Sequence, residues 1–241
     1  MKWVFPYLVL MLTFGCSSEK TPWEAFSPDK FGEPYQIRLH ESERRSGYAF
    51  DGPVKFEIDD LSPLAVDFST YTTNAFDIQL SVPSDLELSS SDSSIVGISD
   101  SSLFRWESVE AAKYADFGYY LRDKIVASEA EGLVLWKITK SMTSLENYPV
   151  VCVNMGPPKT DTPGVYQFST YVEGGKYFHE ITYQVENPKY PALGYGVLLI
   201  ILNSILVEGK PVDFGLDYGT EVDLSLKMET SLGIDLHLNE L

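Results

Sequence analysis

The stretch VYQFSTYVEGGKYFHEITYQV, residues 165–185, constrains the fold of this chain more than any other. Gly174 and Gly175 signal a two-residue hairpin turn, because both central positions of the favoured turn need a positive φ. Closing a hairpin on these glycines predicts the pairs Val172 with Tyr177, Thr170 with His179, Phe168 with Ile181, and Tyr166 with Tyr183. Nearly all the large apolar side chains then share one face, which indicates an antiparallel sheet with that face in the core.

The opposite face of this hairpin is polar apart from one aromatic pair. Its polar members are Ser169, Glu180, Gln167 and Thr182. The same register places Tyr171 opposite Phe178, close to the turn. Two explanations remain open. Either the C-terminal strands or the N-terminal segment with Trp23 and Phe26 cover the pair, or the pair is exposed and forms the aromatic centre of a binding patch. Tyr171 and Phe178 are therefore the candidate binding residues.

The other patterns in the chain predict short strands and two helices. Alternating apolar and polar residues, or short apolar runs, predict strands in YQIRLH, PVKFEI, PLAVDFSTY, AFDIQLSV, IVGI, GLVLWKITK and PVVCVNM. One helix is expected over about residues 107–127, where large apolar side chains recur at helical spacing at Tyr114, Phe117, Leu121 and Ile125. A second helix is expected over residues 191–207. The predicted fold class is α+β, a mostly antiparallel sheet with two helices.

The second expected helix, in PALGYGVLLIILNSILVEG, is strongly apolar. Its apolar part from Ala192 to Val207 includes Asn203 and Ser204 and falls short of the roughly 20 residues that a bilayer span needs. We therefore expect this helix to lie buried beneath a sheet.

The order of elements from Phe76 to Leu206 is strand, short strand, amphipathic helix, strands, long hairpin and a buried helix that ends in LNSIL. This order resembles the PsbP-like fold, an α/β/α sandwich. The resemblance implies a fold and no functional residue, because that superfamily shares its architecture and not an active site.

The N-terminus, MKWVFPYLVLMLTFGCSSEK, has the form of an export signal: Lys2 is followed by an apolar run too short to span a bilayer. The step from Gly15 to Cys16 resembles the lipobox of bacterial lipoproteins, in which the cysteine thiol is acylated. The chain has Thr13 and Phe14 where the family pattern prefers a leucine and a small residue. An ordinary cleaved signal peptide is the alternative. The other cysteine, Cys152, lies in an apolar strand and is expected to be buried and unpaired.

These features divide the chain into a lipoprotein signal peptide, a tether and one globular domain. The signal peptide is residues 1–15, the tether is 16–34, and the domain is 35–241, with a core at 76–206 and a C-terminal β-hairpin at 221–239. The resemblance to lipoproteins implies attachment to a membrane of the bacterial cell envelope through acylated Cys16. The outer membrane is favoured for a Gram-negative host, because Ser17 rather than aspartate follows the cysteine.

The charge and the residue patterns also limit the function. With 35 acidic and 18 basic residues, the net charge of −17 disfavours binding to nucleic acid. The three histidines, His40, His179 and His237, lie in separate predicted strands, so no metal site or other cofactor is expected. The chain lacks a serine nucleophile elbow and a phosphate-binding loop, and no enzyme activity is expected.

Three functions therefore remain open. The first is an envelope lipoprotein with a non-catalytic domain that is structural or binds another envelope protein. The second is a carrier or sensor that holds a small apolar ligand between the sheet and the helix from Leu193 to Leu206. The third is an enzyme of an unrecognised type.

Overall fold

A computed structural model describes residues 37–39, 49–58, 64–73, 77–144, 146–158, 163–188, 191–216 and 220–221. The expected signal peptide, the tether, Cys16 and nearly all of the C-terminal hairpin lie outside the described residues. At 37–39, 57–58, 191–192 and 220–221 the description extends to the backbone alone.

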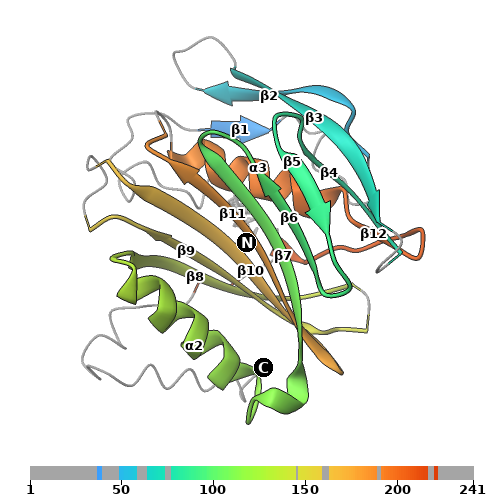
Figure 1. Ribbon diagram of the computed structural model, residues 1–241, viewed down its shortest axis with the longest axis vertical. Coiled ribbons are helices and arrows are strands. Elements are labelled where there is room, and N and C mark those ends of the chain that lie inside the picture. The colour runs from blue at the N-terminus through green and yellow to red at the C-terminus, as the bar shows by residue number, and fades with distance from the viewer. Residues whose placement is uncertain are drawn as a thin grey trace, which may run out of the picture.

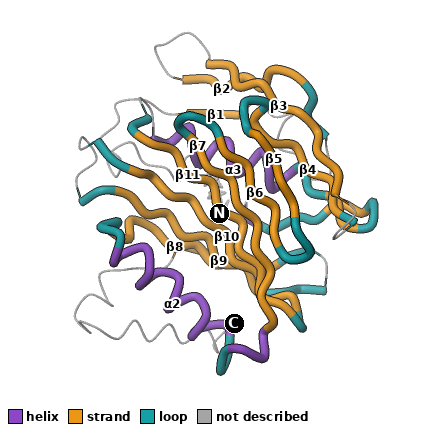
Figure 2. Tube along the Cα trace, in the orientation of Figure 1, coloured by secondary structure: helices purple, strands orange, loops and turns teal. Residues whose placement is uncertain are grey.

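The strands of the described residues form two antiparallel sheets (Figure 1; Figure 2). The smaller sheet has the spatial order β1 (Ile37–Leu39), β2 (Gly52–Ile58), β3 (Leu64–Thr73), β4 (Ile78–Pro83), β12 (Leu206–Val207) and β13 (Lys210–Pro211). The larger sheet has the order β14 (Thr220–Glu221), β8 (Val134–Met142), β9 (Pro149–Gly156), β10 (Val165–Gly174), β11 (Tyr177–Glu186), β7 (Ser102–Glu110), β6 (Ser94–Ile98) and β5 (Glu87–Ser90).

The described residues form two α-helices, and the fold is α+β as the sequence predicts. Helix α2 (Phe117–Ala130) covers one face of the larger sheet, and helix α3 (Pro191–Asn203) packs on the other face and against β4 of the smaller sheet (Figure 1). A short 3-10 turn, η2 (Ala111–Lys113), connects β7 to the segment before α2. Within the described part of the chain, no helix is long and apolar enough to cross a membrane.

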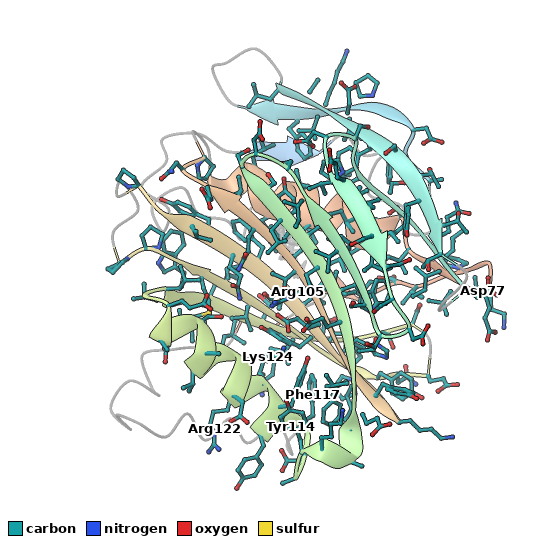
Figure 3. All side chains as sticks on the ribbon, viewed as in Figure 1. Asp77, Arg105, Tyr114, Phe117, Arg122 and Lys124 are labelled. Atoms are coloured by element: carbon teal, nitrogen blue, oxygen red, sulfur yellow. The ribbon has the colours of Figure 1, made fainter. Side chains whose placement is uncertain are left out.

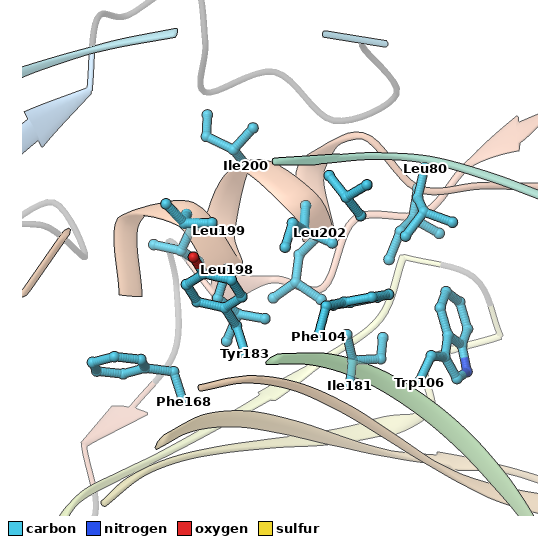
Figure 4. Packing of buried hydrophobic residues seen from close by; sticks show 14 of the residues in the cluster. Leu80, Phe104, Trp106, Phe168, Ile181, Tyr183, Leu198, Leu199, Ile200 and Leu202 are labelled. Atoms are coloured by element: carbon cyan, nitrogen blue, oxygen red, sulfur yellow. The ribbon is translucent and has the colours of Figure 1, made fainter. Parts of the chain in front are cut away.

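The main core lies between α3 and the larger sheet. Leu198, Ile200, Ile201 and Leu202 are fully buried in α3, as the sequence predicts for this helix. Figure 4 shows Phe104 and Ile181 on the side of their strands that faces α3. A separate apolar cluster fills the space between α2 and the opposite face of the same sheet. The larger sheet is thus buried on both faces, which the alternating pattern of its hairpin did not predict.

The predicted start of the first helix is wrong by about ten residues. Residues 107–110 belong to β7, which pairs with β11 along its whole length, so the hydrogen bonds of this segment go to a sheet rather than to a helix turn. The helix begins after Asp116, whose side chain accepts a hydrogen bond from the backbone N–H of Tyr119 at 2.9 Å. Aspartate at this position satisfies one of the unpaired N–H groups of the first turn.

The predicted end of the second helix is late by four residues. The helix ends at Asn203, and Leu206 and Val207 pair with β4 instead. Ser204 turns the chain: its hydroxyl donates to the carbonyl of Ile201 at 2.7 Å and accepts from the N–H of Ser81 at 2.7 Å. A side chain that bonds the backbone in this way competes with continuation of the helix.

The hairpin of β10 and β11 exists, but its predicted register is wrong by two residues. Gly174 pairs with Tyr177, and Val172 pairs with His179. The turn is therefore Gly175 and Lys176, and of the two glycines only Gly175 has a positive φ, at 68°. Since side chains alternate with a period of two, a shift of two residues keeps every side chain on its predicted face.

Candidate functional site

Tyr171 and Phe178, the candidate binding residues, do not form an exposed patch. Tyr171 is 1% exposed and Phe178 is 3% exposed. In the observed register Tyr171 lies opposite Glu180, so the two aromatic side chains are diagonal neighbours. The rings that cover them belong to α2: Tyr120 lies 6.0 Å from Tyr171, and Phe117 lies 5.3 Å from Phe178, between ring centroids. Helix α2 therefore covers this face of the hairpin.

A buried carboxylate joins α2 to the same face. Glu180 is 1% exposed and forms ion pairs with Arg105 Nη2 at 2.9 Å and with Lys124 Nζ at 2.5 Å. Figure 3 labels both cations, Arg105 on β7 and Lys124 on α2. Burial opposes ionisation of Glu180, but the two positive charges and their hydrogen bonds outweigh it and hold the pKa of this carboxyl below its ordinary value.

Neutral polar side chains extend this network across the sheet. The hydroxyl of Thr182 donates to Glu180 at 3.0 Å and lies 2.8 Å from the hydroxyl of Ser169. The amide of Gln167 donates to the hydroxyl of Ser128 on α2 at 3.1 Å. Because these groups pair with one another and with α2, the polar face of the hairpin can be buried without a large desolvation penalty. The network therefore attaches α2 to the larger sheet.

A cavity of about 220 Å³ lies on the opposite face of the hairpin, where the two sheets meet beyond the end of α3. Its lining comes from β4, β7, β10, β11, the segment between β8 and β9 and the segment that follows α3, and it is mostly apolar. Apolar lining residues from the two sheets include Ile78, Trp106, Val172, Ile181 and Val207, and Phe214 comes from the segment after β13. The polar side chains of the lining are Thr143, Tyr148 and His179.

His179 is the titratable group of this cavity with the most perturbed environment. Its Nδ1 lies 2.8 Å from the hydroxyl of Ser108, and its ring stands edge-on to Trp106 with 6.3 Å between centroids. Burial lowers the pKa of the imidazole from 6.5 to about 4, so the ring is neutral at pH 7. The sequence places His179 opposite Thr170 at the core edge, and the structure places it opposite Val172 and Ser108.

Gly174 makes room for this ring. A Cβ atom at position 174 would lie 2.6 Å from Nε2 and 2.7 Å from Cδ2 of His179, which is closer than real Cβ contacts. The glycine is therefore explained by the packing of the imidazole and not by a positive φ. This is the signal that sequence reasoning missed: a glycine in a strand beside a histidine on the core face marks a close approach.

The side chains of the cavity favour binding of a small molecule over proton transfer. A serine and a histidine within hydrogen-bond distance have the spacing of a nucleophile and its base. A base with a pKa of about 4, however, removes a proton poorly near pH 7. Apolar walls with three uncharged polar side chains, Thr143, Tyr148 and His179, are instead typical of a ligand site.

Two further expectations concern metals and the thiol. Among the described residues, no group of three or more His, Cys, Asp or Glu side chains is placed to hold a metal ion. Cys152 is buried and unpaired, and burial raises the pKa of its thiol to about 12. Its Sγ lies 3.0 Å from the hydroxyl of Thr170.

No protein-family model and no curated protein sequence matches this chain. Solved structures with a similar fold include the Ran-binding protein Mog1p of Saccharomyces cerevisiae, with 11% identity over 59% of this chain and 96% of that chain, and a TM-score of 0.45. They also include the cyanobacterial PsbP of Synechocystis, with 8% identity over 58% of this chain and 92% of that chain, and a TM-score of 0.40. The second protein carries the fold that the element order from Phe76 to Leu206 resembles. At these TM-scores neither likeness bears on function.

Proposed function

We propose that the chain is a lipid-anchored lipoprotein of the bacterial cell envelope whose folded domain is a non-catalytic carrier or sensor of a small apolar ligand. The observation that supports ligand binding is the apolar cavity of about 220 Å³ between the two sheets. It adjoins the end of α3, the helix beside which the sequence predicts such a ligand. The cavity favours the carrier over protein docking at Tyr171 and Phe178, since both of these side chains lie beneath α2.

The size of the cavity limits the ligand. A dry apolar cavity of about 150 Å³ is known to take up benzene, and pockets for drug-sized molecules begin at about 300 Å³. At about 220 Å³ this cavity lies between these two sizes. The expected ligand is therefore a compact molecule of one or two fused rings, or an aliphatic group of similar volume.

The ligand is tested by filling the cavity. Val207→Trp places a large side chain at a half-buried lining position, and Val126→Trp places the same side chain on the exposed face of α2 as a matched control. Native mass spectrometry of protein extracted from its own host should find a bound small molecule in the parent and in Val126→Trp. The Val207→Trp variant should lack it. An equal bound mass in all three proteins, or none in the parent, would contradict the carrier.

The anchor is tested at Cys16, which lies outside the described residues. Each buried methylene of an acyl chain contributes about 0.8 kcal/mol, so two or three chains hold a protein firmly on a bilayer. Cys16→Ala should release the protein from the membrane fraction or leave it unprocessed, whereas Cys152→Ala, the matched control, should remain with the membrane. A Cys16→Ala protein that partitions into detergent like the parent would rule out lipidation at this position.

A protein-binding role is the second candidate, and the outer face of α2 is the observation that favours it. Tyr119 and Val126 lie two helical turns apart and are 49% and 52% exposed. The guanidinium of Arg122 lies 4.7 Å from the centroid of the Tyr119 ring. Replacing Tyr119 and Val126 by Ser should reduce the recovery of a cross-linked envelope protein without lowering the melting temperature. Unchanged recovery would remove this candidate.

A further inference from the structure

We infer that His179 selects the ligand of this cavity: its Nε2 forms a hydrogen bond with the single polar atom of an uncharged aromatic molecule of one or two rings. This inference rests on the proposed function, because it assigns the ligand class of the same cavity. It is carried by the orientation of the imidazole, the charge of the lining and the aromatic walls.

The orientation of the ring follows from its two neighbours. The hydroxyl of Ser108 occupies Nδ1 at 2.8 Å. The Nε2–Cδ2 edge lies against Gly174, which itself lines the cavity. Among the described residues no side chain takes Nε2 as its partner. The glycine at 174 lets this edge approach the strand closely, since a larger residue there would collide with it. Nε2 is not among the described polar atoms that are fully buried without a partner, so the ring nitrogen keeps access to the cavity.

The charge of the site favours a neutral ligand. No Asp, Glu, Lys or Arg is among the described residues that line the cavity. The imidazole is itself neutral at pH 7, because burial has lowered its pKa to about 4. A charged ligand would lose its hydration without meeting an opposite charge, and this loss is unfavourable in an apolar cavity.

The walls favour an aromatic ligand. Trp106 and His179 stand at 88° to each other, and Tyr148 and Phe214 also line the cavity. Ring systems gain from edge-to-face and offset contacts with such side chains beyond the area that they bury. A planar bicyclic molecule with one heteroatom matches the volume, the uncharged walls and the Nε2 of His179, for which no described side chain is a partner.

Three probes of nearly equal size test the hydrogen bond. Indene has no hydrogen-bonding atom, indole donates through its N–H, and quinoline accepts through its ring nitrogen. Either tautomer of His179 is compatible with the bond to Ser108, so Nε2 is a donor or an acceptor. One of the two polar probes should therefore bind the mature full chain about fivefold more tightly than indene in calorimetric titrations at pH 7.5.

Two substitutions separate the two ring nitrogens. His179→Gln keeps a polar atom near the position of Nε2, whereas His179→Asn keeps one near the position of Nδ1. The preference for the polar probe should persist at least in part in His179→Gln and vanish in His179→Asn, while indene binds both variants. Thermal melting of both variants shows whether they fold.

The parent protein supplies a second measurement that needs no variant. With ¹⁵N-labelled histidine, saturation with the preferred probe should shift the Nε2 resonance of His179 and leave Nδ1 nearly unchanged. Equal binding of the three probes, an unchanged preference in His179→Asn, or an unmoved Nε2 resonance would each overturn the role of His179 while the cavity still binds. Failure of all three probes to bind the parent would overturn the proposed function itself.

Discussion

The buried carboxylate of Glu180 allows a sharp prediction of stability. Glu180→Gln keeps the size of the side chain and removes its charge, which leaves Arg105 and Lys124 without the carboxylate between them. Removing one partner of a buried ion pair costs about 3–5 kcal/mol, mostly because the remaining charge is left uncompensated. Here the cations expose 32% and 23% of their side chains and can reach water, and the carboxylate of Glu107 remains 3.3 Å from Lys124 Nζ and 3.9 Å from Arg105 Nε. We therefore expect the lower end of that range, about 3 kcal/mol.

Chemical denaturation at pH 7 measures this loss. Such a loss is a large part of the 5–15 kcal/mol that holds a typical domain folded. The midpoint of the urea transition should fall with little change in slope, and the melting temperature should fall by about 6–12 °C. Glu129→Gln, on the exposed face of α2, is the matched control and should change stability by less than about 0.5 kcal/mol.

The pH dependence gives an independent check on the cause. The pKa of Glu180 is lower in the folded protein than its ordinary value of 4.5, so the folded state binds fewer protons than the unfolded chain near that pH. The stabilisation is complete above about pH 4.5 and is lost as the pH falls through the folded pKa. The difference between parent and Glu180→Gln should therefore be constant near neutral pH and shrink below 4.5. Equal stability of Glu180→Gln and Glu129→Gln at pH 7 would refute this account.

Burial elsewhere leads to three more expectations. Ile201→Asp should abolish cooperative folding, because an unpaired charge would replace a fully buried side chain of α3, whereas Val126→Asp on exposed α2 should melt like the parent. Tyr171→Ser and Phe178→Ser should each cost about 3–5 kcal/mol in urea titrations, and an unchanged melting temperature would show that α2 does not cover them. The pKa of His179 is about 4 in the folded protein and 6.5 ordinarily, so the stability that this group contributes is complete above pH 6.5. The free energy of unfolding should fall by up to about 1.4 kcal/mol per pH unit between pH 6.5 and 4. In denaturation experiments over this pH range, His179→Gln should flatten this fall.

The hairpin shows how far local rules reach. The alternation in VYQFSTYVEGGKYFHEITYQV identifies both strands and both faces, because these depend on neighbours along the chain. The register depends on which residues form the turn, and two adjacent glycines leave two choices. Packing decides between them: Gly174 stays in the strand because the ring of His179 lies against it. That contact joins the two strands of the hairpin, and rules based on the turn residues alone do not take it into account.

The first helix shows the opposite case, in which a local pattern is overridden. Apolar residues from Tyr114 to Ile125 have helical spacing, but the residues just before them pair with β11. The spacing of apolar residues along a short segment cannot predict that the segment pairs with a strand far away in the sequence. The spacing predicts one apolar stripe, and Phe117, Leu121 and Ile125 do form the buried face of α2, whereas Tyr114 lies before the helix begins.

The cavity could not be predicted from the sequence. Its walls come from segments as far apart as Ile78 and Phe214, which only the completed fold brings together. His179 is the lining residue that the sequence marks for its chemistry, because it is a histidine on the predicted core face of the hairpin. The segment after α3 is decisive, because the helix ends at Asn203, which lets Val207 pair with β4 and line the cavity.

The two sites described above share one strand of the hairpin. His179 and Glu180 are neighbours in β11, so their side chains point to opposite faces of the larger sheet, one into the cavity and one beneath α2. The pKa of the folded imidazole is about 4 and the pKa of Glu180 lies below its ordinary value of 4.5, so neither group changes its charge in the folded protein between pH 7 and about pH 5.5. In this range the cavity should stay neutral and the ion pairs that hold α2 should stay intact. A neutral ligand should therefore keep its affinity in mild acid, and a loss of affinity at pH 5.5 would contradict the burial of the imidazole.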